Sequence, residues 1–289
     1  MRRANLIQKE TNQITAVEDL TAVFEAIAST QIAKIKDKVE MSEKFFELLW
    51  QRYSSIRIDP ASRITERGKD KQNAKGVFVI ISAEAGLSGD IDQRLIEAML
   101  KDYDKTATDI IVLGTHGANQ LREQGIAYSR FFKVPESDTY IDVSPVIEAI
   151  SAYSKIKVYY EEYISLGVQE IKTIDLYSHI QAMSQAADPR GDIITAKDTI
   201  FEPSLEEIAD LMEKGMMSLA FSQAILESGL AQSASRFNAM ASAKKLAWEL
   251  VMYHKLEFHR AKRSEGDRRL REVLIGIKKK KKRQARSHR

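Results

Sequence analysis

Apolar residues recur every three or four positions over the long stretch from Leu205 to Gly276, which contains no proline. This spacing places them on one side of a helix, and a sustained seven-residue period predicts a left-handed coiled coil. The positions on that side, most of them apolar or small, are Leu219, Gln223, Leu226, Leu230, Ser233, Phe237, Met240, Lys244, Ala247, Val251, His254, Phe258 and Ala261. At 1.5 Å per residue, roughly 70 residues extend about 105 Å. We therefore expect a projecting helix that needs a second long helix beside it.

A second long helix is predicted at the other end of the chain, where residues Ala4 to Ile56 include neither proline nor glycine. Two apolar series follow one another there, with a shift of one residue in phase between them. They are Val17, Leu20, Phe24 and Ile27, and then Ile32, Ile35, Val39, Ser42, Phe46, Leu49 and Tyr53. Both end helices exceed the usual helix length, which favours an antiparallel coiled coil over two helices of an ordinary bundle.

Between the two helices the apolar period changes to that of buried strands alternating with helices. The strands are expected at 76–82, 109–113 and 140–143, the helices at 91–103, 119–124 and 145–153, and a hairpin at 157–165 and 169–178, joined at Gly167. Such alternation predicts a doubly wound, Rossmann-like α/β sheet with an antiparallel edge. A polar loop is expected at 186–197, and Ser204 is the expected cap of the last helix.

These elements give a helix, an inserted α/β domain and a second helix. The predicted boundaries are an N-terminal coiled-coil helix at 1–58, the α/β domain at 59–203, a C-terminal coiled-coil helix at 204–277 and a basic tail at 278–289.

Composition narrows the possible chemistry. The chain has no cysteine, which excludes disulfides and thiolate metal sites. No apolar run approaches the roughly 18 residues of a membrane span. The net charge of +3 is unevenly distributed, because Arg260 to Arg289 holds 14 Lys and Arg against 3 Asp and Glu and so leaves −8 for the rest. A polybasic end of this kind can bind nucleic acid, anionic lipid or an acidic protein, or can be a solvated tail.

A glycine turn, Gly86-Leu87-Ser88-Gly89, follows the first predicted strand, where α/β sheets often bind ligands. It lacks the Lys-Ser/Thr of a phosphate loop and the third glycine of a dinucleotide fingerprint, and Asp90 would repel a phosphate. We interpret it as a structural turn, with Asp90 as a helix cap, and we expect no cofactor.

The histidines do not predict a catalytic or metal site. His116 lies in the glycine-marked turn after the second strand, and no serine or carboxylate is placed by the sequence to partner it. His254 and His259 are five residues apart, whereas two metal ligands on one helix face need a spacing of four.

In order and motifs the chain resembles the gamma subunit of F-type ATP synthases over nearly its whole length. Thr11-Asn12-Gln13-Ile14-Thr15 resembles the family's Thr-Arg-Gln-Ile-Thr, and the glycine turn resembles its Gly-Leu-Cys/Ser-Gly. The family's C-terminal signature is matched in spacing and type by Glu227-Ser228, Arg236, Ala239-Met240, Ala243, Ala247, Glu272-Val273-Leu274 and Gly276.

The resemblance implies a non-catalytic rotor shaft that couples proton or sodium flow through a membrane ring to ATP synthesis or hydrolysis in a hexamer of alpha and beta subunits. It implies an epsilon subunit and the c-ring as further partners, no nucleic acid, and a peripheral place on the cytoplasmic side of a bacterial inner membrane. The residues it assigns to hexamer contact are Gln13, Ile14, Thr15, Arg260, Lys262, Arg263, Arg268 and Arg269.

The chain departs from the family at several of these positions. The family has a basic residue where Asn12 stands, methionine where Glu18 stands and Arg-Gln where Lys262-Arg263 stands, and it ends near Gly276. The alternatives that remain are a nucleotide-binding α/β module with helical arms, and a nucleic-acid or membrane adaptor acting through the basic tail.

Overall fold

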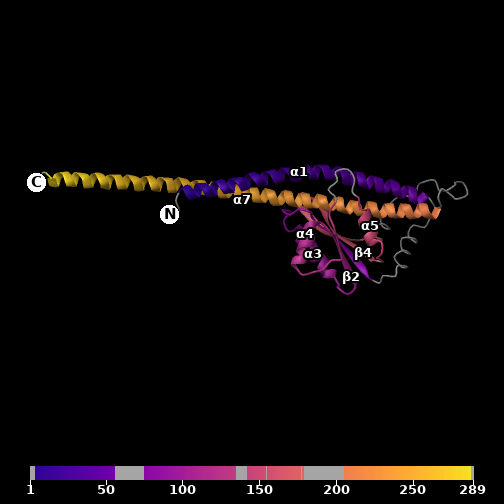
Figure 1. Cartoon of the computed structure of the whole chain (residues 1–289). Coiled ribbons are helices and arrows are strands. Elements are labelled where there is room, and N and C mark those ends of the chain that lie inside the picture. Colours follow the sequence, from indigo (N-terminus) through magenta and orange to yellow (C-terminus); the bar gives the residue numbers. More distant parts are fainter. Residues whose placement is uncertain are drawn as a thin grey trace. The chain divides into compact units, whose positions relative to one another are not determined.

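The computed structural model describes residues 4–55, 75–134, 142–153, 155–176, 178 and 205–287. Two long helices, α1 (Ala4–Ser55) and α7 (Leu205–Ser287), precede and follow a five-stranded α/β sheet in the chain (Figure 1). This confirms the predicted fold class. The contacts divide the chain into two compact units, unit 1 (Met1–Glu25 and Met240–Arg289) and unit 2 (Ala26–Ala239).

In unit 1 the two helices are paired antiparallel. The backbone N–H of Ala4 donates to Glu265 Oε1 at 3.2 Å, and Lys244 Nζ donates to Glu25 Oε2 at 2.9 Å. Ala4 and Ile7 also pack with Ala261 and Phe258. In unit 2 the same antiparallel order holds, because Ile35 lies against Gly229 and Leu49 against Gly215.

In the first half of α1, the residues that lie in the helix seam differ from the predicted ones. Most of the buried and half-buried positions follow an unbroken heptad with no phase shift: Ala4, Ile7, Thr11, Ile14, Glu18, Thr21, Glu25, Ala28, Ile32, Ile35, Val39, Ser42, Phe46 and Leu49. Val17, Leu20, Phe24 and Ile27, which were expected in the seam, are exposed, so that prediction was wrong. The predicted α7 series is confirmed, because every one of its positions is buried or half-buried.

The sheet of unit 2 has the order β3-β2-β1-β4-β5. Its strands are β1 (Gly76–Ile81), β2 (Thr108–Leu113), β3 (Arg130–Phe132), β4 (Lys155–Ser165) and β5 (Val168–Asp175). All neighbours are parallel except β4 and β5, which form the predicted antiparallel edge. The continuous apolar sequences of β1 and β2 are typical of central strands covered on both faces.

Each face of the sheet has its own apolar core. Val77, Val79 and Ile81 of β1 pack against α5 (Ser144–Ile150), α7 and Phe46 of α1. Ile80 of the same strand packs on the other face against α3 (Ile91–Asp102) and α4 (Thr115–Glu123). The alternation of side chains along the strand therefore separates the two layers.

Three elements differ from the predicted ones. The third strand is Arg130–Phe132, whereas 140 and 141 lie outside the described residues and 142 and 143 are not in a strand. Helix α4 begins at Thr115, so His116 lies in its first turn rather than in a loop. Helix α7 continues past Ile277 to Ser287. The loop expected at 186–197 and the cap expected at Ser204 also lie outside the described residues.

Candidate functional site

The seam of unit 1 is unusually polar for a coiled coil. On α1 it holds Thr11, Glu18, Thr21 and Glu25. The hydroxyl of Thr11 donates to the carbonyl of Ile7 at 2.7 Å, and that of Thr21 donates to the carbonyl of Glu18 at 2.8 Å. These threonine hydroxyls are satisfied within their own helix and add nothing to the pairing. The helix pair is therefore held by few large apolar contacts.

The outer surface of unit 1 carries the apolar side chains that the seam lacks. They are Leu6, Val17, Leu20, Val23 and Phe24 on α1, and Leu246, Trp248, Leu250, Met252, Tyr253 and Leu256 on α7, each 37–61% exposed. Val17, Leu20 and Phe24 share one helix face by their spacing. Extended exposed apolar surface is uncommon on monomeric proteins and marks interaction sites. The outer surface of unit 1 is therefore a candidate interaction site.

The residues predicted to contact a partner take different positions on unit 1. Gln13 is exposed, Ile14 is half-buried in the seam, and the hydroxyl of Thr15 donates to the carbonyl of Thr11 at 3.0 Å. The basic residues Arg260, Lys262, Arg263, Arg268 and Arg269 are all exposed. They form a cationic surface on α7.

Two of these cations have neighbours on their own helix. Lys262 Nζ lies 5.8 Å from the centre of the Phe258 ring, and Arg268 Nε lies 3.3 Å from Glu272 Oε1. Because Ala4, the first described residue, bonds Glu265, no described residue of α1 extends further along α7. Residues 266–279 are all exposed, and they include the apolar Leu270, Val273, Leu274 and Ile277.

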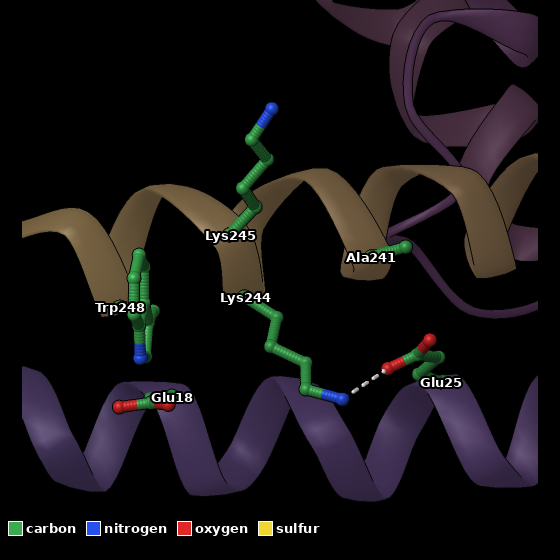
Figure 2. Close-up of a pocket in the computed structure, with 6 residues that line it drawn as sticks. All are labelled: Glu18, Glu25, Ala241, Lys244, Lys245 and Trp248. Atoms are coloured by element: carbon green, nitrogen blue, oxygen red, sulfur yellow. Dashed lines mark hydrogen bonds and ion pairs between the residues drawn. The ribbon is translucent and has the colours of Figure 1, made fainter.

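A groove of about 360 Å³ lies between the two helices of unit 1 (Figure 2). We call it the Trp248 groove, and its lining residues are Glu18, Glu25, Ala241, Lys244, Lys245 and Trp248. Lys244 reaches across to Glu25, whereas Lys245 points away from α1. The indole of Trp248 points toward α1 beside Glu18.

In unit 2 the glycine turn is bound to α7. The carbonyls of Ala85 and Gly86 accept hydrogen bonds from the Arg236 guanidinium at 3.0 and 3.3 Å. The carbonyl of Ser88 accepts from Ser235 Oγ at 2.6 Å. The carbonyls of this turn are therefore directed at a neighbouring helix, and the structural role of Gly86, Leu87, Ser88 and Gly89 stays a prediction.

Gly89 and Leu87 have positive φ values of 71° and 69°. Gly89 adopts this conformation without steric cost, whereas Leu87 adopts it as a strained non-glycine residue. Asp90 is the N-terminal cap residue of α3, as predicted, but its side chain makes no capping hydrogen bond. Its carboxylate lies 3.8 Å from Arg94 Nε.

Behind this turn is a buried polar cluster centred on Asp92. Its carboxylate accepts from the backbone N–H of Ala83 at 2.8 Å and from the Ser88 hydroxyl at 3.0 Å, and it lies 2.9 Å from His116 Nδ1. The sequence alone placed no carboxylate beside His116, but α3 and α4 bring it together with Asp92, a residue 24 positions away. Ser88 bonds the carboxylate rather than the imidazole, so the cluster lacks the serine–histidine contact of a nucleophilic site.

Glu161 of β4 is a second buried carboxyl group in unit 2. Its Oε2 lies 2.5 Å from Ser228 Oγ and 2.7 Å from Gln232 Nε2, both on α7. Complete burial, together with the nearby negative charge of Asp92, raises the pKa of Glu161 to about 8. The group is therefore mostly uncharged at neutral pH and joins the sheet to α7.

The part of the chain that the structure describes holds no group of three or more His, Asp or Glu side chains that could bind a metal ion. None of its helices has a stretch apolar enough and long enough to cross a lipid bilayer.

The candidate interaction surface that the sequence prediction missed is the apolar exterior of α1. Its signal was present as the change of phase between Ile27 and Ile32, which marks two different faces of one continuous helix rather than a shifted seam.

Comparison with known proteins gives a consistent result over nearly the whole chain. The sequence profile of the family described as ATP synthase matches residues 3–278. The ATP synthase gamma chain of Malacoplasma penetrans is 24% identical over 96% of this chain and 99% of its own length. That of Halothermothrix orenii is 23% identical over 93% and 96%.

Solved structures with a similar fold come from rotary complexes. A chain of the Euglena gracilis mitochondrial ATP synthase OSCP/F1/c-ring assembly in rotational state 3 matches with a TM-score of 0.66 at 13% identity, covering 94% of each chain. A chain of the rotor of the same enzyme in rotational state 1 matches with a TM-score of 0.61 at 14% identity, covering 90% of this chain and 98% of that one. At these identities the likeness concerns the fold.

Proposed function

The chain belongs to the ATP synthase family as a gamma-type central-stalk subunit. We propose that it is the rotor shaft inside a hexamer of alpha and beta subunits that synthesises or hydrolyses ATP. One observation supports this most directly: unit 1 has a polar seam and an apolar exterior. A helix pair of this kind is completed by a surrounding apolar sleeve, which the hexamer would supply.

The shaft acts by differential contact rather than by a reactive group. Because α1 and α7 present different side chains outward, each rotational position offers a different surface to each catalytic site. A site whose conformations differ in their contact with the shaft is shifted toward the conformation that binds it better. Catalysis would then reside on the beta subunits, and this chain is a non-catalytic partner.

The remaining partners follow from the family. The sheet of unit 2 would contact the epsilon subunit and the membrane c-ring, so that proton or sodium flow through the ring turns the shaft. The complex would be peripheral to the cytoplasmic face of a bacterial inner membrane. The exposed cations Arg260, Lys262, Arg263, Arg268 and Arg269, together with Gln13, Ile14 and Thr15, are the proposed hexamer contacts.

No observation favours the two alternatives. In a nucleotide-binding module the Gly86–Gly89 turn would face a phosphate, but its carbonyls bond Ser235 and Arg236. For the adaptor that acts through the basic tail, the described structure offers no feature that identifies nucleic acid or lipid as the ligand.

Co-expression with the alpha and beta subunits of the same organism tests the proposal. We expect a stable complex in which ATP hydrolysis depends on this chain, measured by size exclusion and by steady-state turnover. A chain that stays monomeric beside an assembled hexamer would contradict it.

A further inference from the structure

The Trp248 groove contains one carboxylate that no described residue pairs with in an ion pair or hydrogen bond. Glu25 is paired with Lys244 at 2.9 Å, and Lys245 points away from α1 (Figure 2). Glu18 is half-buried, and its side chain has neither an ion pair nor a hydrogen bond among the residues that the structure describes. The groove therefore has an unpaired negative charge on one wall.

The opposite wall is an aromatic ring. Trp248 is 51% exposed and points toward α1 beside Glu18. Tryptophan is the best of the aromatic side chains at attracting a cation to its face. A guanidinium group in particular can stack on an aromatic ring while it donates two hydrogen bonds to a carboxylate.

The surface near the groove is apolar. Val17 precedes Glu18 in the sequence, and Leu20 follows it by two residues; both are exposed. Met252, one helical turn after Trp248, is exposed as well. A partner that covers these side chains removes water from Glu18, and a carboxylate that is desolvated without a counter-charge is strongly unfavourable. An acidic partner side chain would be repelled by Glu18.

We propose that the Trp248 groove receives one arginine or lysine side chain from an otherwise apolar segment of the subunit that encloses unit 1. The inference rests on the proposed function, which supplies an enclosing subunit. It adds the chemistry of the contact: the cation pairs with Glu18 and stacks on Trp248, and the flanking apolar residues keep the pair dry. The groove thus fixes the register between the shaft and its sleeve.

The test uses the full chain and the co-expressed hexamer. Affinity is measured by titrating a labelled chain into the hexamer, at low and at high salt. Glu18→Gln is expected to weaken binding about tenfold and to reduce its salt dependence. Glu18→Lys should weaken it further, and Trp248→Leu, which keeps an apolar side chain, should weaken it roughly threefold. Thermal unfolding of each free variant checks that the fold is kept.

Asp19→Asn and Asp19→Lys are the matched controls, because Asp19 is an exposed carboxylate next to Glu18 that does not line the groove. Each Asp19 variant should bind the hexamer with an affinity closer to that of the unmodified chain than the corresponding Glu18 variant does. If the Glu18 variants bind as tightly as the unmodified chain, or if Glu18→Lys binds more tightly, the groove does not receive a cation. If the unmodified chain itself does not bind the hexamer, the proposed function fails, and the inference fails with it.

Discussion

The hydroxyl of Ser228 lies 2.5 Å from the buried carboxyl of Glu161, which joins α7 to β4 across 67 positions of sequence. Gln232 Nε2 donates to the same oxygen at 2.7 Å, so both α7 residues hold one acidic side chain in a site without solvent. The junction between the helix and the sheet in unit 2 therefore depends on the protonation of one group.

This junction predicts a pH dependence of stability. Burial raises the pKa of Glu161 to about 8, whereas its ordinary value is 4.5. Between these values the folded chain holds a proton that the unfolded chain has lost, so the free energy of unfolding should fall as pH rises from 4.5 to about 8 and change little above that. Glu161→Gln should remove this part of the pH dependence, as measured by urea unfolding at a series of pH values. If the free energy of unfolding changes with pH equally in the variant and the unmodified chain, the prediction is wrong.

The close approach of α4 to Ser82, the residue that follows β1, predicts a strong effect at Gly117. A Cβ added there would lie 2.3 Å from Ser82 Oγ and 2.7 Å from Ser82 Cβ, so Gly117→Ala should destabilise the fold by about 2 kcal/mol or more. Gly167→Ala is the control, because no heavy atom lies within 4 Å of its added Cβ and its φ is not positive. Thermal unfolding of the two variants should separate them clearly. Similar melting temperatures would show that Ser82 moves aside.

The apolar exterior of unit 1 predicts that stability and assembly can be separated. Leu20→Gln and Phe24→Gln replace exposed side chains, so the free chain should keep its stability within about 0.5 kcal/mol. Assembly with the hexamer should be weakened, because the sleeve would then cover polar groups. Binding measurements and unfolding curves on the same samples decide this. Leu95→Gln, in the core of unit 2, should by contrast lower the stability of the free chain.

The cationic surface predicts an effect on coupling. Charge reversal at Lys262 and Arg263 should lower the ATPase activity of the complex, while circular dichroism shows that the chain still folds, since both side chains are exposed. Reversal at Lys255 is a suitable comparison, because it is exposed on the same helix outside this surface. Unchanged turnover in a complex that contains the reversed pair would contradict the assignment.

The fold could be predicted where the apolar residues of an element all pack within the chain itself. The α7 series was right because its apolar and small positions face α1, and the strands β1 and β2 were right because both of their faces are covered. In α1 the same rule failed at Val17 and Leu20, since apolar residues there serve an external surface while Glu18 and Thr21 occupy the seam. Periodicity shows which residues share a face but not what covers that face.

The site was less predictable because it depends on contacts that are distant in sequence. The Gly86–Gly89 turn and the α7 signature residues Ser228 and Arg236 were recognised separately, but only the structure shows Arg236 bonding the turn. The pairing of His116 with Asp92 requires the packing of α3 on α4, which no local pattern encodes. Strand β3 was missed because its three residues are too few to show a period.

The threonine, glutamate and alanine side chains between the helices of unit 1 have a mechanical consequence. Interlocked leucines resist the rotation of one helix about the other, whereas short and polar side chains make few such interlocks. Unit 1 taken alone should therefore twist at low energetic cost, like a soft torsional spring. Its stiffness would then depend mainly on the subunits that enclose it.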